Sequence, residues 1–313
     1  MALSKLGGDE QCLIFSQLCN TLDPLIAMAF SSASSELQAL TQPLQQQLKA
    51  DYEAATALAR KLGWNFKSCK DLRKAMVISS GRSIYYLSHW TYDGLTATDL
   101  ELLGTLVLPA LGSLHLREPA AGPDGVQRLA EKLCAGALPA LTILEFSNMQ
   151  VGDAGASALA AALGRGAIPR LKSLNLILSY IGDAGLVALA PALRRLPALE
   201  HLDLCYNSFG DEGLAALVAP PAAAGALRPP AGDVLTRLKK LKVGGNMGAE
   251  ITDAGCATLA EAIDSGILPV LEEVLLKHIL ASDASRAAVQ DALTWRLTDF
   301  GAAEKWCMLS LGS

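Results

Sequence analysis

The sequence predicts an open α/β solenoid in which short parallel strands form one face and helices form the other. Apolar residues recur in the order Leu-x-x-Leu-x-Leu at a nearly fixed period, and such self-similarity is the signature of a repeat array. Each copy is followed by an Asp-x-Gly segment and an Ala/Leu-rich stretch with helical spacing. Counted from their first apolar position, the copies begin at Leu111, Leu141, Leu171, Leu199, Leu238 and Leu271.

One copy is enough to justify each element. Leu174 and Leu176 alternate with the residues between them, which is the two-residue period of a strand. Asp183 follows, at a position where its carboxylate could cap a helix by accepting backbone N–H bonds. Leu189 and Leu193 then repeat at the four-residue spacing of an inward helix face. No copy can bury its own leucines, so stacked copies are expected to share one core.

The array is irregular at two places. A degenerate copy is expected one period upstream of Leu111, beginning at Gly81 and spanning residues 81–110, as a cap on the array. Its strand would contain Ile84 and Tyr86. Residues 219–233, between the fourth and fifth complete copies, carry two Pro-Pro pairs and no apolar period, which indicates an insertion rather than a helix.

The Leu171-Lys-Ser-Leu174-Asn-Leu176 motif and its relatives, the Asp-Ala-Gly segments and the 28–30-residue period resemble the ribonuclease-inhibitor type of leucine-rich repeat. The resemblance implies a horseshoe with parallel strands on its concave face and helices on its convex face. The ladder asparagine of that family is matched only at Asn207 and Asn246, and Ser179 stands at its position one copy earlier.

Three regions are predicted. Residues 1–80 form a small all-helical domain, residues 81–296 the repeats, and residues 297–313 a C-terminal tail. Residues 6–40 resemble an F-box through Leu6, the Asp9-Glu10 pair and the apolar positions that follow, although the early proline of that family is absent. This resemblance implies docking to a ubiquitin-ligase scaffold, whereas the alternative is a helical bundle that only caps the first repeat.

The outward side chains of the predicted strands are the candidate binding site. Aromatic and apolar side chains flanked by charges are typical of protein–protein contacts. The middle copies are acidic to apolar and the C-terminal copies basic, so we expect a protein partner with a mixed, partly basic surface; the alternative is that these are ordinary solvent positions. The candidate partner-binding residues are Tyr85, His115, Arg117, Glu145, Asn175, Ile177, His201, Asp203, Tyr206, Lys240, Lys242 and Lys277.

Little in the sequence points to catalysis. No Walker loop, His-Glu-x-x-His or Gly-x-Ser-x-Gly motif is present, so we assign no catalytic residue, cofactor, metal or small-molecule substrate. His115 and Glu145 would approach each other from neighbouring strands, and Cys205 lies two residues beyond Asp203 on the His201 strand, where a Cys-His pair is conceivable. Ran GTPase-activating proteins share this type of repeat, so a GTPase regulator is kept as a further alternative.

Composition limits the partners and the compartment. A net charge of −5 is too mild to predict binding to nucleic acid or to an anionic membrane. No apolar run reaches the roughly 18 residues that a membrane span needs. The seven cysteines are scattered and odd in number, which favours free thiols and hence the cytoplasm, or the nucleus as well.

Overall fold

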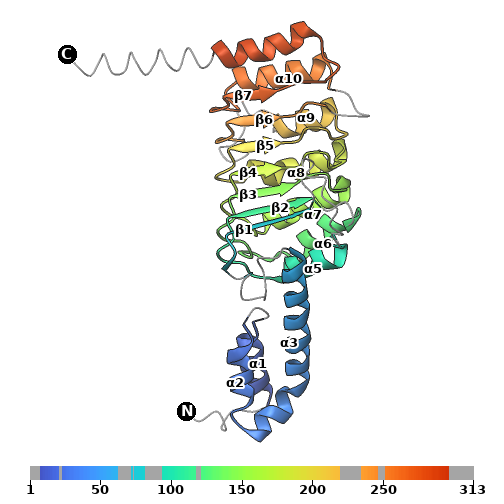
Figure 1. The fold of residues 1–313 in the computed structure, drawn as a ribbon. Helices are drawn as coiled ribbons and strands as arrows, with labels where there is room; N and C mark the ends of the chain where they lie inside the picture. The colour runs from blue at the N-terminus through green and yellow to red at the C-terminus, as the bar shows by residue number, and fades with distance from the viewer. Residues whose placement is uncertain are drawn as a thin grey trace, which may run out of the picture.

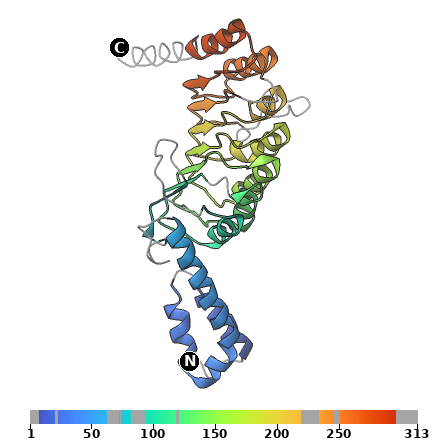
Figure 2. The same ribbon diagram turned by 45° about the vertical axis from the view of Figure 1, so that its right-hand side comes forward.

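The computed structural model describes residues 8–20, 23–62, 72, 74–81, 94–117, 121–218, 234–245 and 251–295. In that part of the chain, seven parallel strands stack in chain order as one sheet, and helices stack along its other side (Figure 1). The view in Figure 2 shows the same two layers and places the N-terminal helices beyond the first strand. The predicted α/β leucine-rich-repeat solenoid is therefore confirmed.

The strands are short and in the predicted register. Leu144, Leu174 and Leu202 pair directly across neighbouring strands, and each is at most 1% exposed. The side chains between them point to the opposite face of the sheet, as the pleat requires. The strands are β1 (Val77–Gly81), β2 (Ser113–Arg117), β3 (Ile143–Phe146), β4 (Ser173–Asn175), β5 (His201–Asp203), β6 (Lys240–Lys242) and β7 (Glu273–Leu275).

A helix follows most of the strands and closes each copy. Leu189 and Leu193 are fully buried on the inward face of their helix, as their spacing predicted. Residues 283–295 are also helical. The repeat helices are α5 (Ala97–Thr105), α6 (Gly125–Lys132), α7 (Gly152–Gly164), α8 (Asp183–Arg194), α9 (Asp211–Val218) and α10 (Asp253–Asp264).

Three N-terminal helices precede the sheet: α1 (Gly8–Leu18), α2 (Leu25–Ser31) and α3 (Ser35–Leu62). They bury a small core of their own around Phe15, Ala27 and Leu48. The last turns of α3 instead join the solenoid core, where Leu58 and Leu62 are almost fully buried. Lys61 also forms an ion pair of 2.7 Å with Asp99 at the start of α5. One long helix thus covers the first repeat and carries the other two.

The degenerate first copy was predicted in the wrong place. Its strand is β1, which ends at Gly81 rather than following it, so the sheet starts before the expected boundary at residue 81. Ile78 pairs with Leu114 and is fully buried, while its neighbours Val77 and Ser79 are exposed. This alternation, and not a Leu-x-x-Leu motif, sets the register. Residues 84 and 86, the insertion at 219–233 and the tail at 297–313 lie outside the described residues.

The capping aspartates also act differently from the prediction. The N-cap of α8 is Gly182, and Asp183 does not cap its own helix. Its carboxylate accepts hydrogen bonds from the backbone N–H groups of Gly210 and Gly213, at the start of the next helix. Asp153 does the same for Gly182 and Gly185. Each copy therefore caps its successor.

Candidate functional site

The candidate site is the strand face, which we define as the outward side chains of β1–β7 together with the first residues after each strand. The two-residue period of the strands places these side chains opposite the buried leucines. Of the predicted residues, Tyr85 lies outside the described part of the chain. The other eleven lie on the strand face, in the outward positions of β2–β6 or just beyond a strand end.

The N-terminal part of the face is held by one carboxylate. Glu145 accepts hydrogen bonds from Arg117 at 3.1 Å and from Ser147 at 2.6 Å, and its other oxygen lies 3.0 Å from His115 Nδ1. Desolvation raises the pKa of Glu145, but these hydrogen bonds outweigh it and leave the pKa below its usual value. The approach of His115 to Glu145 was predicted from the sequence; the contribution of Ser147 was not.

In the central copies, the polar side chains turn toward their own backbone. Asn175 Oδ1 accepts the N–H of Ile177 at 3.0 Å, and Asp203 Oδ1 accepts the N–H of Cys205 at 3.1 Å. The other Asp203 oxygen lies 3.7 Å from Lys242 Nζ on the next strand. These contacts fix the side chains in one orientation before any partner binds.

The C-terminal part of the face is less basic than its lysines suggested. Lys240 Nζ lies 2.8 Å from Glu273 Oε2, and the hydrogen bond with this carboxylate raises the pKa of Lys240. His201 is half-buried in the strand between, directly across from Lys240. Lys277 is exposed just after β7. Because Lys240 and Lys242 each face an acid, the predicted basic end is largely neutralised.

The chain leaves five of the strands through the same unusual backbone conformation. The residues seven positions after the start of each copy all have φ between 53° and 72°. Asparagine and glycine tolerate this left-handed region, whereas a leucine or tyrosine adopts it at a cost. These residues are Asn148, Leu178, Tyr206, Gly245 and His278.

Two of those positions expose large side chains. Leu178 and Tyr206 lie in adjacent copies and are 39% and 40% exposed. A Cβ added at Gly245 would lie 2.6 Å from the Tyr206 ring, so the ring rests on the Gly245 backbone. Tyr180, two residues after Leu178, is 63% exposed. We call Leu178, Tyr180 and Tyr206 the apolar patch; Leu178 and Tyr180 were not among the predicted site residues, and only their apolar character in a turn could have signalled them.

The described residues hold no catalytic arrangement that would use Cys205. This cysteine is buried, and burial raises the pKa of its thiol to about 12, with the neighbouring Asp203 carboxylate acting in the same direction. A thiol of this pKa is not a nucleophile at neutral pH. Across the described part of the chain, no three His, Cys, Asp or Glu side chains are grouped so that they could bind a metal ion. Likewise, no helix described is long and apolar enough to cross a membrane.

The comparisons with known proteins agree with the repeat architecture. A family model described as Leucine Rich repeat matches residues 138–160 and 196–218, which contain β3 and β5. No curated protein matches the chain. Among solved structures, the chain is similar to the actin-binding site 2 of leiomodin-1, with 14% sequence identity and a TM-score of 0.37 over 69% of this chain and 95% of that chain. The fold is thus carried by the family match and by the register of the seven strands.

Proposed function

We propose that this leucine-rich-repeat solenoid is a non-enzymatic protein-interaction module that binds a protein partner on its strand face. The observation that carries the proposal is the apolar patch of Leu178, Tyr180 and Tyr206, exposed on the rigid central copies. Aromatic side chains at the centre of an interface supply much of its binding energy, because they bury a large area at little cost in conformational entropy.

The charged groups around the patch suit the rim of such an interface. Glu145 is held by Arg117 and His115 on one side, and Asp203 lies near Lys242 on the other. Partly solvated charges of this kind direct orientation and selectivity more than affinity. A partner with a mixed, partly basic surface around an apolar centre complements this arrangement.

The experiment is capture of binding proteins by the full chain and by two variants. Replacing Tyr180 and Tyr206 together by alanine removes the aromatic part of the patch. Val187→Ala, at an exposed position of similar apolar character on α8, is the matched control. We expect the control to retain the captured partner and the double variant to lose it. Retention of every captured protein by the double variant, with its stability unchanged, would refute the assignment of the strand face.

A second candidate is supported by a separate apolar surface on the N-terminal helices. Leu13, Leu25 and Ile26 are each more than 60% exposed, and all three fall within the F-box-like residues 6–40. Exposed apolar side chains clustered on short helices mark a docking surface. In this candidate the chain is an F-box-like adaptor that joins a ubiquitin-ligase scaffold to a substrate held on the strand face.

The two candidates separate in one experiment on the full chain. If the adaptor candidate is right, a purified ligase scaffold binds the wild type, and replacing Leu25 and Ile26 by aspartate abolishes this binding without affecting the strand-face partner. If the scaffold does not bind the wild type, the plain interaction module remains. Faster hydrolysis of GTP by a captured small GTPase would instead favour a regulator of the Ran-activator type.

We also propose a location in the cytoplasm, with access to the nucleus. The support is the pattern of free cysteines, since five of the seven are described and none of these five is in a disulfide. Fluorescence imaging of the tagged full chain would test it, and an exclusively secretory distribution would contradict it.

A further inference from the structure

The sheet has an open edge at its C-terminal end. In the inner copies, the N–H of the second strand leucine donates to the next strand, as from Leu176 to the carbonyl of Asp203 and from Leu204 to that of Lys242, both at 2.8 Å. Leu276 is the equivalent residue after β7. Within the described residues its N–H has no acceptor, and β7 pairs only with β6. An edge of this kind is a template for another strand.

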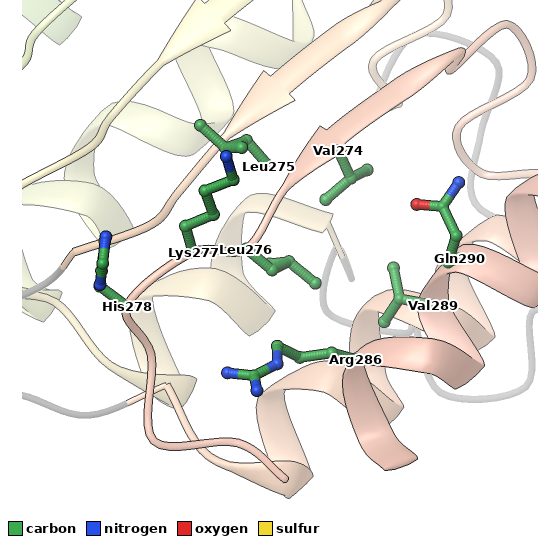
Figure 3. A pocket seen from close by; sticks show the side chains of 8 residues that line it. All are labelled: Val274, Leu275, Leu276, Lys277, His278, Arg286, Val289 and Gln290. Carbon is green, nitrogen blue, oxygen red and sulfur yellow. The ribbon is translucent and has the colours of Figure 1, made fainter. Parts of the chain in front are cut away.

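The apolar rows of the core also end uncovered there. The inward strand residues Leu241 and Val243 are fully buried, whereas their successors Val274 and Leu276 are only half-buried. A hollow of about 430 Å³ opens beside them. Figure 3 shows Val274 and Leu276 on its strand side and Val289 on its helix side. The last copy therefore presents the same surface on which, elsewhere in the molecule, a further copy packs.

The remaining chain carries a matching segment. Trp306-Cys-Met-Leu309-Ser-Leu311 places apolar residues at the spacing of Leu271, Val274 and Leu276 in the copy before it. Its first residue follows Leu271 by 35 residues, within the range of 28 to 39 between the other copies. The chain is also long enough, because 23 residues separate Asp283 from Trp306, against 18 between Asp253 and Leu271.

We propose that residues 306–311 form an eighth strand, parallel to β7 on its open edge, and that they close the C-terminal end of the core. In the register of the other copies, Leu309 lies beside Val274 and Leu311 beside Leu276. The Leu276 N–H then donates to the Ser310 carbonyl, and the Glu272 carbonyl accepts from the two residues after Trp306. Met308 and Ser310 point outward with the rest of the strand face. Closing the edge with the chain's own segment removes a surface prone to pairing between molecules.

Amide hydrogen exchange on the full chain tests the proposal. We expect the N–H groups of Leu276 and His278 to exchange at least ~10-fold more slowly in the wild type than in Leu309→Asp. Ser310→Asp is the matched control, because its side chain would face solvent, and it should keep the wild-type rates. The amides of β3 to β5 serve as an internal reference that the remaining solenoid is folded in each variant.

Three results would overturn the proposal. Leu276 and His278 amides that exchange in the wild type as fast as unprotected amides would mean that the edge is open. Equal effects of Leu309→Asp and Ser310→Asp would exclude a strand with one buried face. Protection that rises with protein concentration would assign the edge to a second copy of the chain instead of to residues 306–311.

Discussion

The carboxylate of Asp183 accepts a hydrogen bond of 2.7 Å from the backbone N–H of Gly213, thirty residues later and one copy further along the solenoid. A Cβ on Gly213 would lie 2.7 Å from the same carboxylate oxygen. The Asp-x-Gly motif is therefore a contact between copies: the aspartate of one copy caps the next helix, and the glycine of that next copy leaves room for it. Gly185 and Gly255 receive Asp153 and Asp211 with the same close approach.

The first prediction concerns this contact. Asp183→Ala should lower the free energy of unfolding by about 1.5–3 kcal/mol, because it removes a charged acceptor from two backbone N–H groups. Gly213→Ala should cost about 1–3 kcal/mol, since the added methyl displaces the carboxylate. Chemical denaturation of the two variants measures both effects, and in the double variant the costs should add to less than their sum.

Gly164 supplies the control for the glycine. Nothing lies within 4 Å of a Cβ added there, and the residue is at the end of a helix. Gly164→Ala should leave stability unchanged or raise it by up to about 1 kcal/mol. If Gly213→Ala behaved like Gly164→Ala, the contact between copies would not constrain the glycine.

How far the sequence predicted the fold depends on whether an element is defined within one copy. The burial of Leu174 follows from local alternation, and the structure confirms it. The target of Asp183 does not, because the sequence of one copy cannot distinguish capping of its own helix from capping of the next. The position of β1 was missed because Ile78 is the only inward apolar residue of the pattern between Val77 and Ser79.

The ladder asparagine lies between these cases. Asn207 is buried, accepts the N–H groups of Ser179 and Ile181, and donates to the carbonyls of Leu176 and Leu204. Its position was predicted from the repeat pattern. Ser179, which stands at the same place one copy earlier, keeps one such bond through its hydroxyl, to the Phe146 carbonyl at 3.1 Å. The turn therefore survives a substitution that the pattern alone marked as a departure.

The second prediction is a pH dependence carried by Glu145. Its pKa is lower in the folded chain than in the unfolded chain, so its ionised form stabilises the fold at pH above about 4.3, the unfolded value. This contribution disappears as the pH falls through the folded pKa. Glu145→Gln should therefore be less stable than the wild type by about 1–2 kcal/mol at pH 7 and nearly equal to it below about pH 3. Denaturation of both proteins across this range measures the difference; a gap that stays constant with pH would show that the hydrogen bonds do not favour the ionised form.

The third prediction concerns the reactivity of Cys205. With a thiol pKa of about 12, only about one molecule in 10⁴ carries the thiolate at pH 8, and the side chain is buried as well. Native labelling with iodoacetamide should modify the exposed Cys134 and leave Cys205 intact. Peptide-resolved mass spectrometry distinguishes them, and unfolding in denaturant should make both reactive. Comparable native rates at the two cysteines would restore the Cys-His pair as a possibility.

The last prediction separates the binding role of the apolar patch from any structural role. Leu178 has φ of 53°, as does Asn148 at the same position of the previous copy. Asparagine tolerates this conformation better than leucine, so Leu178→Asn should leave the free energy of unfolding unchanged or raise it by about 0.5–1 kcal/mol. The same change removes an exposed apolar side chain from the patch and should weaken the captured partner by about 10-fold. Denaturation and binding titration are measured on one preparation. Loss of stability by more than about 1 kcal/mol would mean that Leu178 supports the fold, whereas unchanged affinity would exclude it from the interface, because a stable solenoid that binds poorly is the outcome that only a contact residue produces.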